Sequence, residues 1–155
     1  MNRHLRVFAL LFLMPAPVMA ADNLITVKSA HPFDTTLSRV ESSAKRQGFI
    51  VFGRLDHAAA AASVGQKMPP STVLVIGNPK VGTERFVKFP TYAIDLPLKV
   101  LIWEDQNGAT SISYNNAAFM RGVNERHGLP QSEATEQAAK RTEDMVGALV
   151  KAASE

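Results

Sequence analysis

Two glycines enclose a short turn that has part of the spacing of a phosphate-binding loop. Gly77 and Gly82 stand five positions apart, but Thr83 follows Gly82 directly, so the lysine that this loop requires is missing. The pattern therefore argues against a nucleotide triphosphate site. Backbone N–H groups of a glycine-rich turn before a helix can still hold an anion or a carboxylate. The alternative is a tight turn in which glycine serves only the backbone geometry.

Asp95 and Lys99 lie four positions apart around Pro97 at the expected entrance of a strand, and a simple alternating strand explains neither charge. Such a pair can bind a substrate or shift a pKa, and an ion pair at a solvated strand end is the simpler interpretation. If a ligand site exists, we expect it here and at the preceding turn. Lys80 and Lys99 would supply positive charge, and Asn78 a hydrogen-bonding amide. Asp95 would orient the ligand, which would be an anionic small molecule.

His57 is a further candidate, at the start of a short helix that Asp56 can cap. An imidazole in the first turn of a helix lies in positive potential and tends to be neutral near pH 7, so it can act as a base or as a metal ligand. His31 and His127 are far from it in sequence, and the chain has no cysteine and no paired metal-ligand spacing. We therefore expect neither a metal site nor a cofactor.

The elements that would position these residues are strands and helices mixed along the chain. The alternation of apolar and polar residues, the helix caps and the glycine stops define their limits. Expected strands cover residues 24–30, 49–55, 72–76, 98–104 and 110–114, with an extended segment at 91–95. Expected helices cover residues 34–47, 58–62, 83–88, 116–127 and 131–152. We find no repeat and no linker, so the pattern predicts a single α+β domain, with a mainly antiparallel sheet and helices packed on it.

Two details of this assignment can be checked directly. Asn107 and Gly108 favour a tight hairpin between the last two strands, with positive φ at both positions. On the last helix, the helical period places one stripe of side chains toward the core. Its members are Ala138, Thr142, Met145, Leu149 and Ala152.

The first twenty residues have the three-part pattern of a secretory signal peptide, with a basic start, an apolar run and small residues before Ala20. We expect cleavage near Ala20 and a periplasmic or secreted domain over residues 21–155. Arg3 and Arg6 would leave with the signal, so 15 of the 17 basic residues would face 14 acidic ones, a net charge of +1. That balance gives no case for nucleic acid. Without a second long apolar run or a cysteine, we expect no stable membrane anchor.

Several motifs in combination resemble the family called domain of unknown function 302. The resemblance covers essentially the whole chain after the signal, and it implies a compact α+β fold that often self-associates. It implies no activity, because the family has no established one. The matching segments are residues 33–48, 56–59, 77–83 (GNPKVGT), 94–105 (IDLPLKVLIWED), 113–115 (SYN) and 126–129.

Three functions remain open at this point. Export, near-neutral charge and the lack of a catalytic constellation favour a non-enzymatic module that binds or senses a small ligand. The first alternative is a small hydrolase or isomerase that uses His57 or Asp95 as a base. In that case Lys80 or Lys99 would hold an anionic group of the substrate. The second alternative is a structural or partner-binding homodimer.

Overall fold

Five strands of the computed structural model pair in the order β1-β5-β4-β3-β2, and every neighbouring pair is antiparallel. The model describes residues 23–155, so the signal peptide expected over residues 1–20 lies outside the described residues. The described part confirms the predicted α+β fold with an antiparallel sheet. The strands are β1 (Leu24–Lys28), β2 (Ile50–Asp56), β3 (Ser71–Gly77), β4 (Leu98–Glu104) and β5 (Thr110–Asn115).

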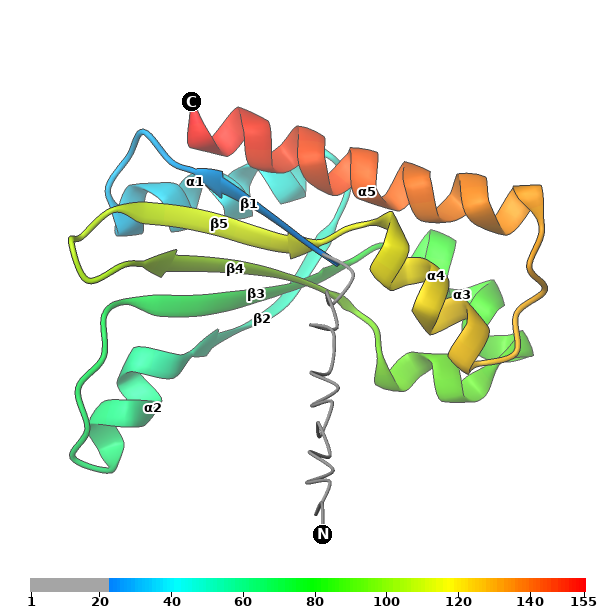
Figure 1. Cartoon of the computed structure of the whole chain (residues 1–155), viewed down its shortest axis with the longest axis horizontal. Coiled ribbons are helices and arrows are strands. Elements are labelled where there is room, and N and C mark those ends of the chain that lie inside the picture. The colour runs from blue at the N-terminus through cyan, green and yellow to red at the C-terminus, as the bar shows by residue number, and fades with distance from the viewer. Residues whose placement is uncertain (1–22) are drawn as a thin grey trace, which may run out of the picture.

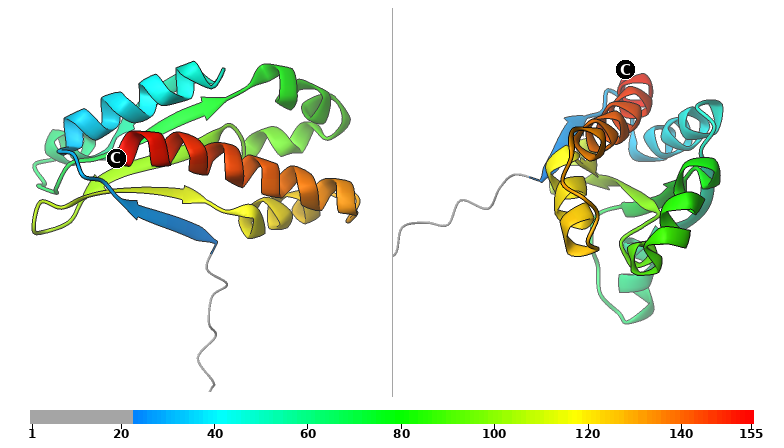
Figure 2. Two further views of the ribbon diagram at one scale, coloured as in Figure 1. Left: turned by 90° about the horizontal axis from the view of Figure 1, so that it is seen from above. Right: turned by 90° about the vertical axis from the view of Figure 1, so that its right-hand side faces the viewer.

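Two long helices lie side by side across one face of this sheet, and shorter helices gather at its ends (Figures 1 and 2). The long ones are α1 (Phe33–Arg46) and α5 (Glu133–Ser154). At one end of the sheet lie α3 (Pro79–Lys88), the 3-10 helix η1 (Pro90–Ile94) and α4 (Ala117–Arg126). The short α2 (His57–Ser63) lies at the opposite end.

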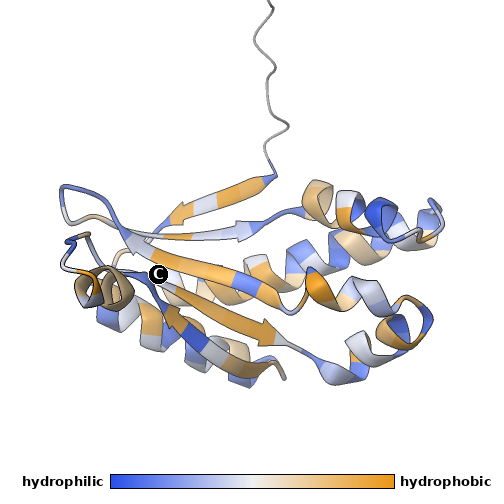
Figure 3. Ribbon diagram, turned by 90° about the horizontal axis from the view of Figure 1, so that it is seen from below, coloured by the Kyte–Doolittle hydropathy of each residue, from blue (hydrophilic) through white to orange (hydrophobic). Residues whose placement is uncertain are grey.

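The core is divided into two clusters that follow this arrangement. The larger one joins the sheet to α1 and α5, and its fully buried members include Val40, Leu74, Ile76, Val100, Ile102, Ile112, Leu149 and Val150. The smaller one lies at the end of the sheet around Tyr92, with Ala117, Met120, Val123, Leu129 and Ala139. The second face of the sheet carries alternate residues such as Val73, Val75 and Leu101, which are only half-buried. Figure 3 views the molecule from this side, with the strands in front of the helices.

Three local predictions from the sequence are wrong, each for a visible reason. Helix α3 begins at Pro79 and not at Thr83, because Asn78 caps it and proline suits the first helical position. Residues 91–95 were expected to be extended, but Pro90–Ile94 form the 3-10 helix η1. The hairpin turn between β4 and β5 has positive φ only at Gly108, and not at Asn107. There the Asp105 carboxylate accepts N–H bonds from Asn107 and Ala109, which organises a wider loop.

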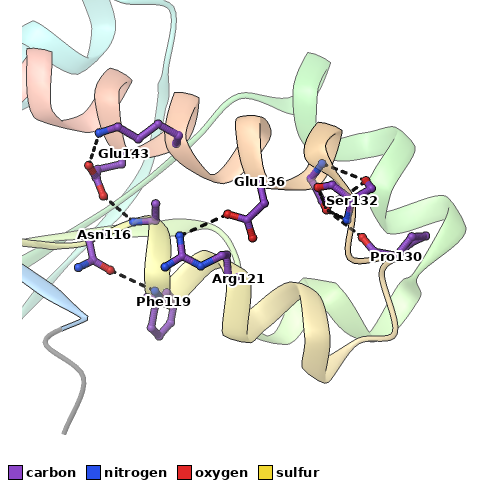
Figure 4. A network of polar contacts seen from close by, with 10 residues as sticks. Asn116, Phe119, Arg121, Pro130, Ser132, Glu136 and Glu143 are labelled. Atoms are coloured by element: carbon purple, nitrogen blue, oxygen red, sulfur yellow. Dashed lines mark hydrogen bonds and ion pairs between the residues drawn. The ribbon is translucent and has the colours of Figure 1, made fainter. Parts of the chain in front are cut away.

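Helix α5 also differs from its prediction, by its limits and by its rotation. It begins two residues later than expected, after Ser132, whose hydroxyl accepts the Thr135 N–H in a capping box (Figure 4). The buried stripe is shifted from the predicted one by about one residue. Of the predicted stripe only Leu149 is buried; the residues that accompany it are Ala139, Val146, Val150 and Ala153. On the predicted stripe, Thr142 is only half-buried and Met145 is exposed.

Side-chain contacts at the start of α4 fix this helix against α5. The Asn116 carboxamide oxygen accepts the Phe119 N–H at 3.1 Å, and the Glu143 carboxylate of α5 accepts the Ala117 N–H at 2.7 Å (Figure 4). A carboxylate at a helix N-terminus is stabilised by the helix dipole. Lys140 and this N–H bond hold the pKa of Glu143 below its usual range. The long helix is therefore tied both to the sheet and to the cluster of short helices.

Candidate functional site

The structure places the five predicted site residues in three different surroundings. Asp95 and Lys99 are close together, with the Lys99 Nζ 3.4 Å from the backbone oxygen of Asp95. Asn78 and Lys80 lie at the start of α3. His57 is exposed at the start of α2. Ile50 pairs with Gly77, so α2 and α3 begin at opposite ends of the β2–β3 pair. A seven-residue strand separates these two ends by roughly 20 Å. The version of the enzyme hypothesis that combines His57 as base with Lys80 therefore lacks the convergence that it needs, whereas Asp95 and Lys99, the other combination, lie close together.

The start of α3 does not offer the backbone anion site that the two glycines suggested. The Asn78 side-chain oxygen accepts the N–H of Lys80 at 3.0 Å. The Asn78 backbone oxygen lies 3.0 Å from the nitrogens of both Val81 and Gly82. Because these N–H groups already have acceptors, they are not available to cradle an anion.

The two glycines instead allow aromatic rings to approach the backbone closely. A Cβ atom at Gly77 would lie 3.0 Å from the Phe52 ring, and one at Gly82 would lie 3.3 Å from the Phe86 ring. Neither glycine has positive φ. Their role is therefore to make room for Phe52 and Phe86, and both of these rings line a cavity.

This cavity has a volume of about 300 Å³ and lies between α3, α5 and the adjoining ends of β2, β3 and β4. Its walls are mainly apolar, as is typical of small-molecule sites, and its volume is at the lower end of their range. Its lining residues include Phe52, Asn78, Val81, Arg85, Phe86 and Met145. The hollow beside α1 that Asp34, Arg39 and Arg46 line is larger, about 550 Å³, but it is polar. The apolar walls, and not the volume, make this cavity the candidate binding site.

Three large apolar side chains of this cavity are left in contact with solvent. Phe52 is 54 % exposed, Val81 62 % and Met145 41 %. They come from β2, α3 and α5, which are far apart in sequence but share one wall. Scattered exposed apolar residues are ordinary, but three that converge on one concavity mark a surface that a ligand can cover.

Arg85 is the charged residue in the wall of the cavity. Its guanidinium carbon lies 5.2 Å from the centre of the Tyr92 ring, and its Nη1 donates to the Tyr92 hydroxyl at 3.3 Å. Tyr92 is fully buried and its hydroxyl donates to the Asn124 side-chain oxygen at 2.7 Å. The sequence patterns did not single out Arg85, because its position depends on Tyr92, which Asn124, far along the chain, in turn holds in place.

A second polar group lies on the outer side of η1, where Asp95 meets His127. The His127 Nε2 is 2.6 Å from the Asp95 carboxylate, and the Thr91 hydroxyl is 2.9 Å from the other ring nitrogen. The order hydroxyl, imidazole, carboxylate is that of a hydrolytic triad. However, none of the cavities described above includes these residues. The imidazole is buried, with 5 % of its side chain exposed, and it ties η1 to the end of α4. We therefore assign the group to the fold.

The Asp95 contacts predict how the stability of the fold depends on pH. The hydrogen bond with His127 lowers the pKa of Asp95 most, and Arg126 and Lys99 lower it further. A lowered pKa adds stability above the unfolded-state value of about 4, and this stability is lost as the pH falls through the folded-state pKa. Asp95→Asn should therefore lower the Tm at pH 6, and the difference from the unaltered protein should shrink below about pH 4. A Tm difference that stays constant from pH 7 to pH 3 would contradict this assignment.

Comparisons with known proteins place this geometry in context. A family model described as domain of unknown function DUF302 matches residues 25–149. A crystal structure of an uncharacterised conserved DUF302 protein from Bacillus stearothermophilus superimposes with a TM-score of 0.73 and 20 % identity, over 86 % of this chain and 99 % of that one. That likeness shows the fold.

Relatives of known name are similar over part of their length. Over 116 residues the chain is 37 % identical to proteins named fluoride-specific ion channel FluC 1 in Brucella suis and in Brucella abortus. The match covers 73 % of this chain and 44 % and 42 % of the two relatives, so the chain spans less than half of their length. Within residues 23–155, none of the helices is both long and apolar enough to cross a membrane. The same residues contain no group of three side chains that could hold a metal ion.

Proposed function

The chain belongs to the domain of unknown function DUF302 family, and from that premise we propose that it is a non-enzymatic module that binds a small, mainly apolar molecule in the cavity between α3 and α5. The observation that carries the proposal is the convergence of Phe52, Val81 and Met145 on this cavity with their side chains open to solvent. Covering them would remove apolar surface from water, at about 25 cal/mol per Å².

The position of the cavity also supports a binding role. It lies where separate elements meet at the end of the sheet, and the enclosing α3 contributes no buried residue to the core. Helix α3 can therefore adjust to a ligand at little cost to the larger core under α1 and α5. If residues 1–20 direct export, the ligand is one that the protein meets outside the cytoplasm.

Binding can be tested with N-phenyl-1-naphthylamine, a neutral apolar dye whose fluorescence rises when it leaves water. We expect the purified protein to bind the dye, and Val81→Trp to weaken binding at least about tenfold, because the larger ring fills the cavity mouth. Tryptophan does not absorb at the excitation wavelength of the dye, so the titration stays readable.

Val87→Trp is the matched control for this experiment. It lies on the same helix, it is also exposed, and it does not line the cavity. Its affinity for the dye should equal that of the unaltered protein, and both variants should keep the same Tm within a few degrees. Dye binding that Val81→Trp leaves intact would place the dye elsewhere and overturn the proposal.

A further inference from the structure

We propose that this cavity selects an anionic amphiphile and that Arg85 binds its carboxylate, an inference that rests on the proposed function. The apolar part would lie on Phe52, Val81 and Met145, and the carboxylate would meet the guanidinium at the α3 side of the cavity. Apolar walls with one convergent charged group are the usual means by which such a pocket fixes the orientation of its ligand.

The guanidinium of Arg85 is held in place before any ligand arrives. The Tyr92 hydroxyl uses its single hydrogen on Asn124, so it is left to accept from Arg85 Nη1. The Tyr92 ring lies below the guanidinium carbon at 5.2 Å, a distance at which a cation is attracted by the ring. Tyr92 is itself fully buried, so this support is rigid. A guanidinium fixed in this way has lost much of its side-chain entropy already, which favours ligand binding.

The guanidinium of Arg85 has no carboxylate within ion-pair distance among residues 23–155. Arg54 and Arg126 each form an ion pair with a carboxylate, whereas no such pair joins Arg85 to any acidic residue within residues 23–155. The side chain is half-buried in a mainly apolar wall. A cation in these surroundings has given up part of its hydration without an ionic partner, so an incoming carboxylate would meet an unused charge. The planar guanidinium can hold both carboxylate oxygens at once.

The size of the cavity sets the size of the ligand. A volume of about 300 Å³ suits a medium-length chain with one head group, and not a long lipid. Lys80 is the alternative cation that could bind the carboxylate of the ligand, because it lies at the start of α3, where the sequence predicted an anionic ligand. However, Lys80 is exposed and does not line the cavity. An anion held there would leave the apolar walls uncovered.

Competition between octanoate, 1-octanol and the neutral dye N-phenyl-1-naphthylamine tests the inference at pH 7. The acid and the alcohol have the same chain length and differ in the charge of the head group. On the unaltered protein we expect octanoate to displace the dye at about tenfold lower concentration than octanol, as a charge-assisted hydrogen-bonded pair should. Arg85→Gln should reduce the ratio of the octanol to the octanoate inhibition constant from about ten to about one, with each constant calculated from the dye affinity measured for that variant. Lys88→Gln removes an exposed positive charge from the same helix and should change neither ligand.

The possible outcomes distinguish a failure of the proposed binding function from a failure of the role given to Arg85. If the dye does not bind, the proposed function fails. If the dye binds but octanoate and octanol compete equally on the unaltered protein, the cavity is apolar only and the role of Arg85 is overturned. If Lys80→Gln, and not Arg85→Gln, abolishes the preference for octanoate, the anion lies at the start of α3 and the assignment to Arg85 is wrong. Loss of the preference in Arg85→Gln alone, at an unchanged Tm, supports the inference.

Discussion

Tyr92→Ala should lower the free energy of unfolding by about 3–5 kcal/mol, the usual cost of removing a large buried aromatic side chain. Tyr92 is the largest fully buried side chain in the described chain, and it is the centre of the smaller core cluster. Its ring contacts Arg85 and His127, which come from α3 and from the end of α4. Without the ring, the short helices at this end of the sheet would surround a void. Urea unfolding followed by far-ultraviolet circular dichroism measures the loss.

Tyr92→Phe separates the ring from its hydroxyl. The phenylalanine keeps the volume but leaves the buried Asn124 oxygen without its donor, which should cost about 1–3 kcal/mol. We therefore expect the free energy of unfolding to increase from Tyr92→Ala to Tyr92→Phe and from Tyr92→Phe to the unaltered protein. A Tyr92→Ala variant within about 1 kcal/mol of the unaltered protein would show that this cluster does not support the fold.

Leu149→Ala should also be severely destabilising, by about 2–5 kcal/mol. Leu149 is fully buried on the face of α5 that packs on the sheet and on α1. Of the two strands that α5 contacts most, β5 is paired with β1 on one side and with β4 on the other, so it is not free to move into the void. Thermal unfolding by calorimetry, together with a urea titration, measures the effect.

Met145→Ala is the control, one turn earlier on the same helix. Its side chain is 41 % exposed and borders the cavity, so truncation should cost less than about 1 kcal/mol. The stripe predicted from the sequence placed both residues in the core, whereas in the structure Leu149 is buried and Met145 is exposed. Equal losses in the two variants would support the stripe predicted from the sequence and would contradict the observed rotation of α5.

The periodic elements were predictable because their signals are local. Residues 73–76 are all apolar and lie in β3, an interior strand of the sheet, and Gly128 ends α4 with the positive φ that glycine tolerates. The errors occurred where two local signals compete. Asn78 and Thr83 are both plausible helix caps, and only the proline after Asn78 favours the earlier start. Likewise, Asn107 fits a tight turn, but the Asp105 side chain stabilises a wider one.

The site was only partly predictable, because its chemistry depends on contacts between distant residues. Of the five predicted site residues, Asn78 lines the cavity. The other four, Lys80, Lys99, Asp95 and His57, do not. The predicted turn at Gly77–Gly82 does line the cavity, so the predicted segment lies nearer to it than most of the predicted side chains. Arg85 and Met145 have ordinary helical positions in the sequence. In the described part of the folded protein Arg85 has no carboxylate partner and the Met145 side chain is exposed to solvent, and both properties depend on packing.

The extra residue in β2, Phe52, is a position at which the protein can evolve while its sheet is kept. Val51 and Gly53 pair with neighbouring residues of β3, so Phe52 between them has no partner. Its side chain can be exchanged without altering the ladder on either side. Mutation at this position can therefore reshape the ligand preference of a lineage while its sheet is inherited unchanged. Deleting Phe52 should instead make the ladder regular, because Val51 and Gly53 would then be neighbours opposite Ile76 and Val75, and the cavity would lose the Phe52 ring.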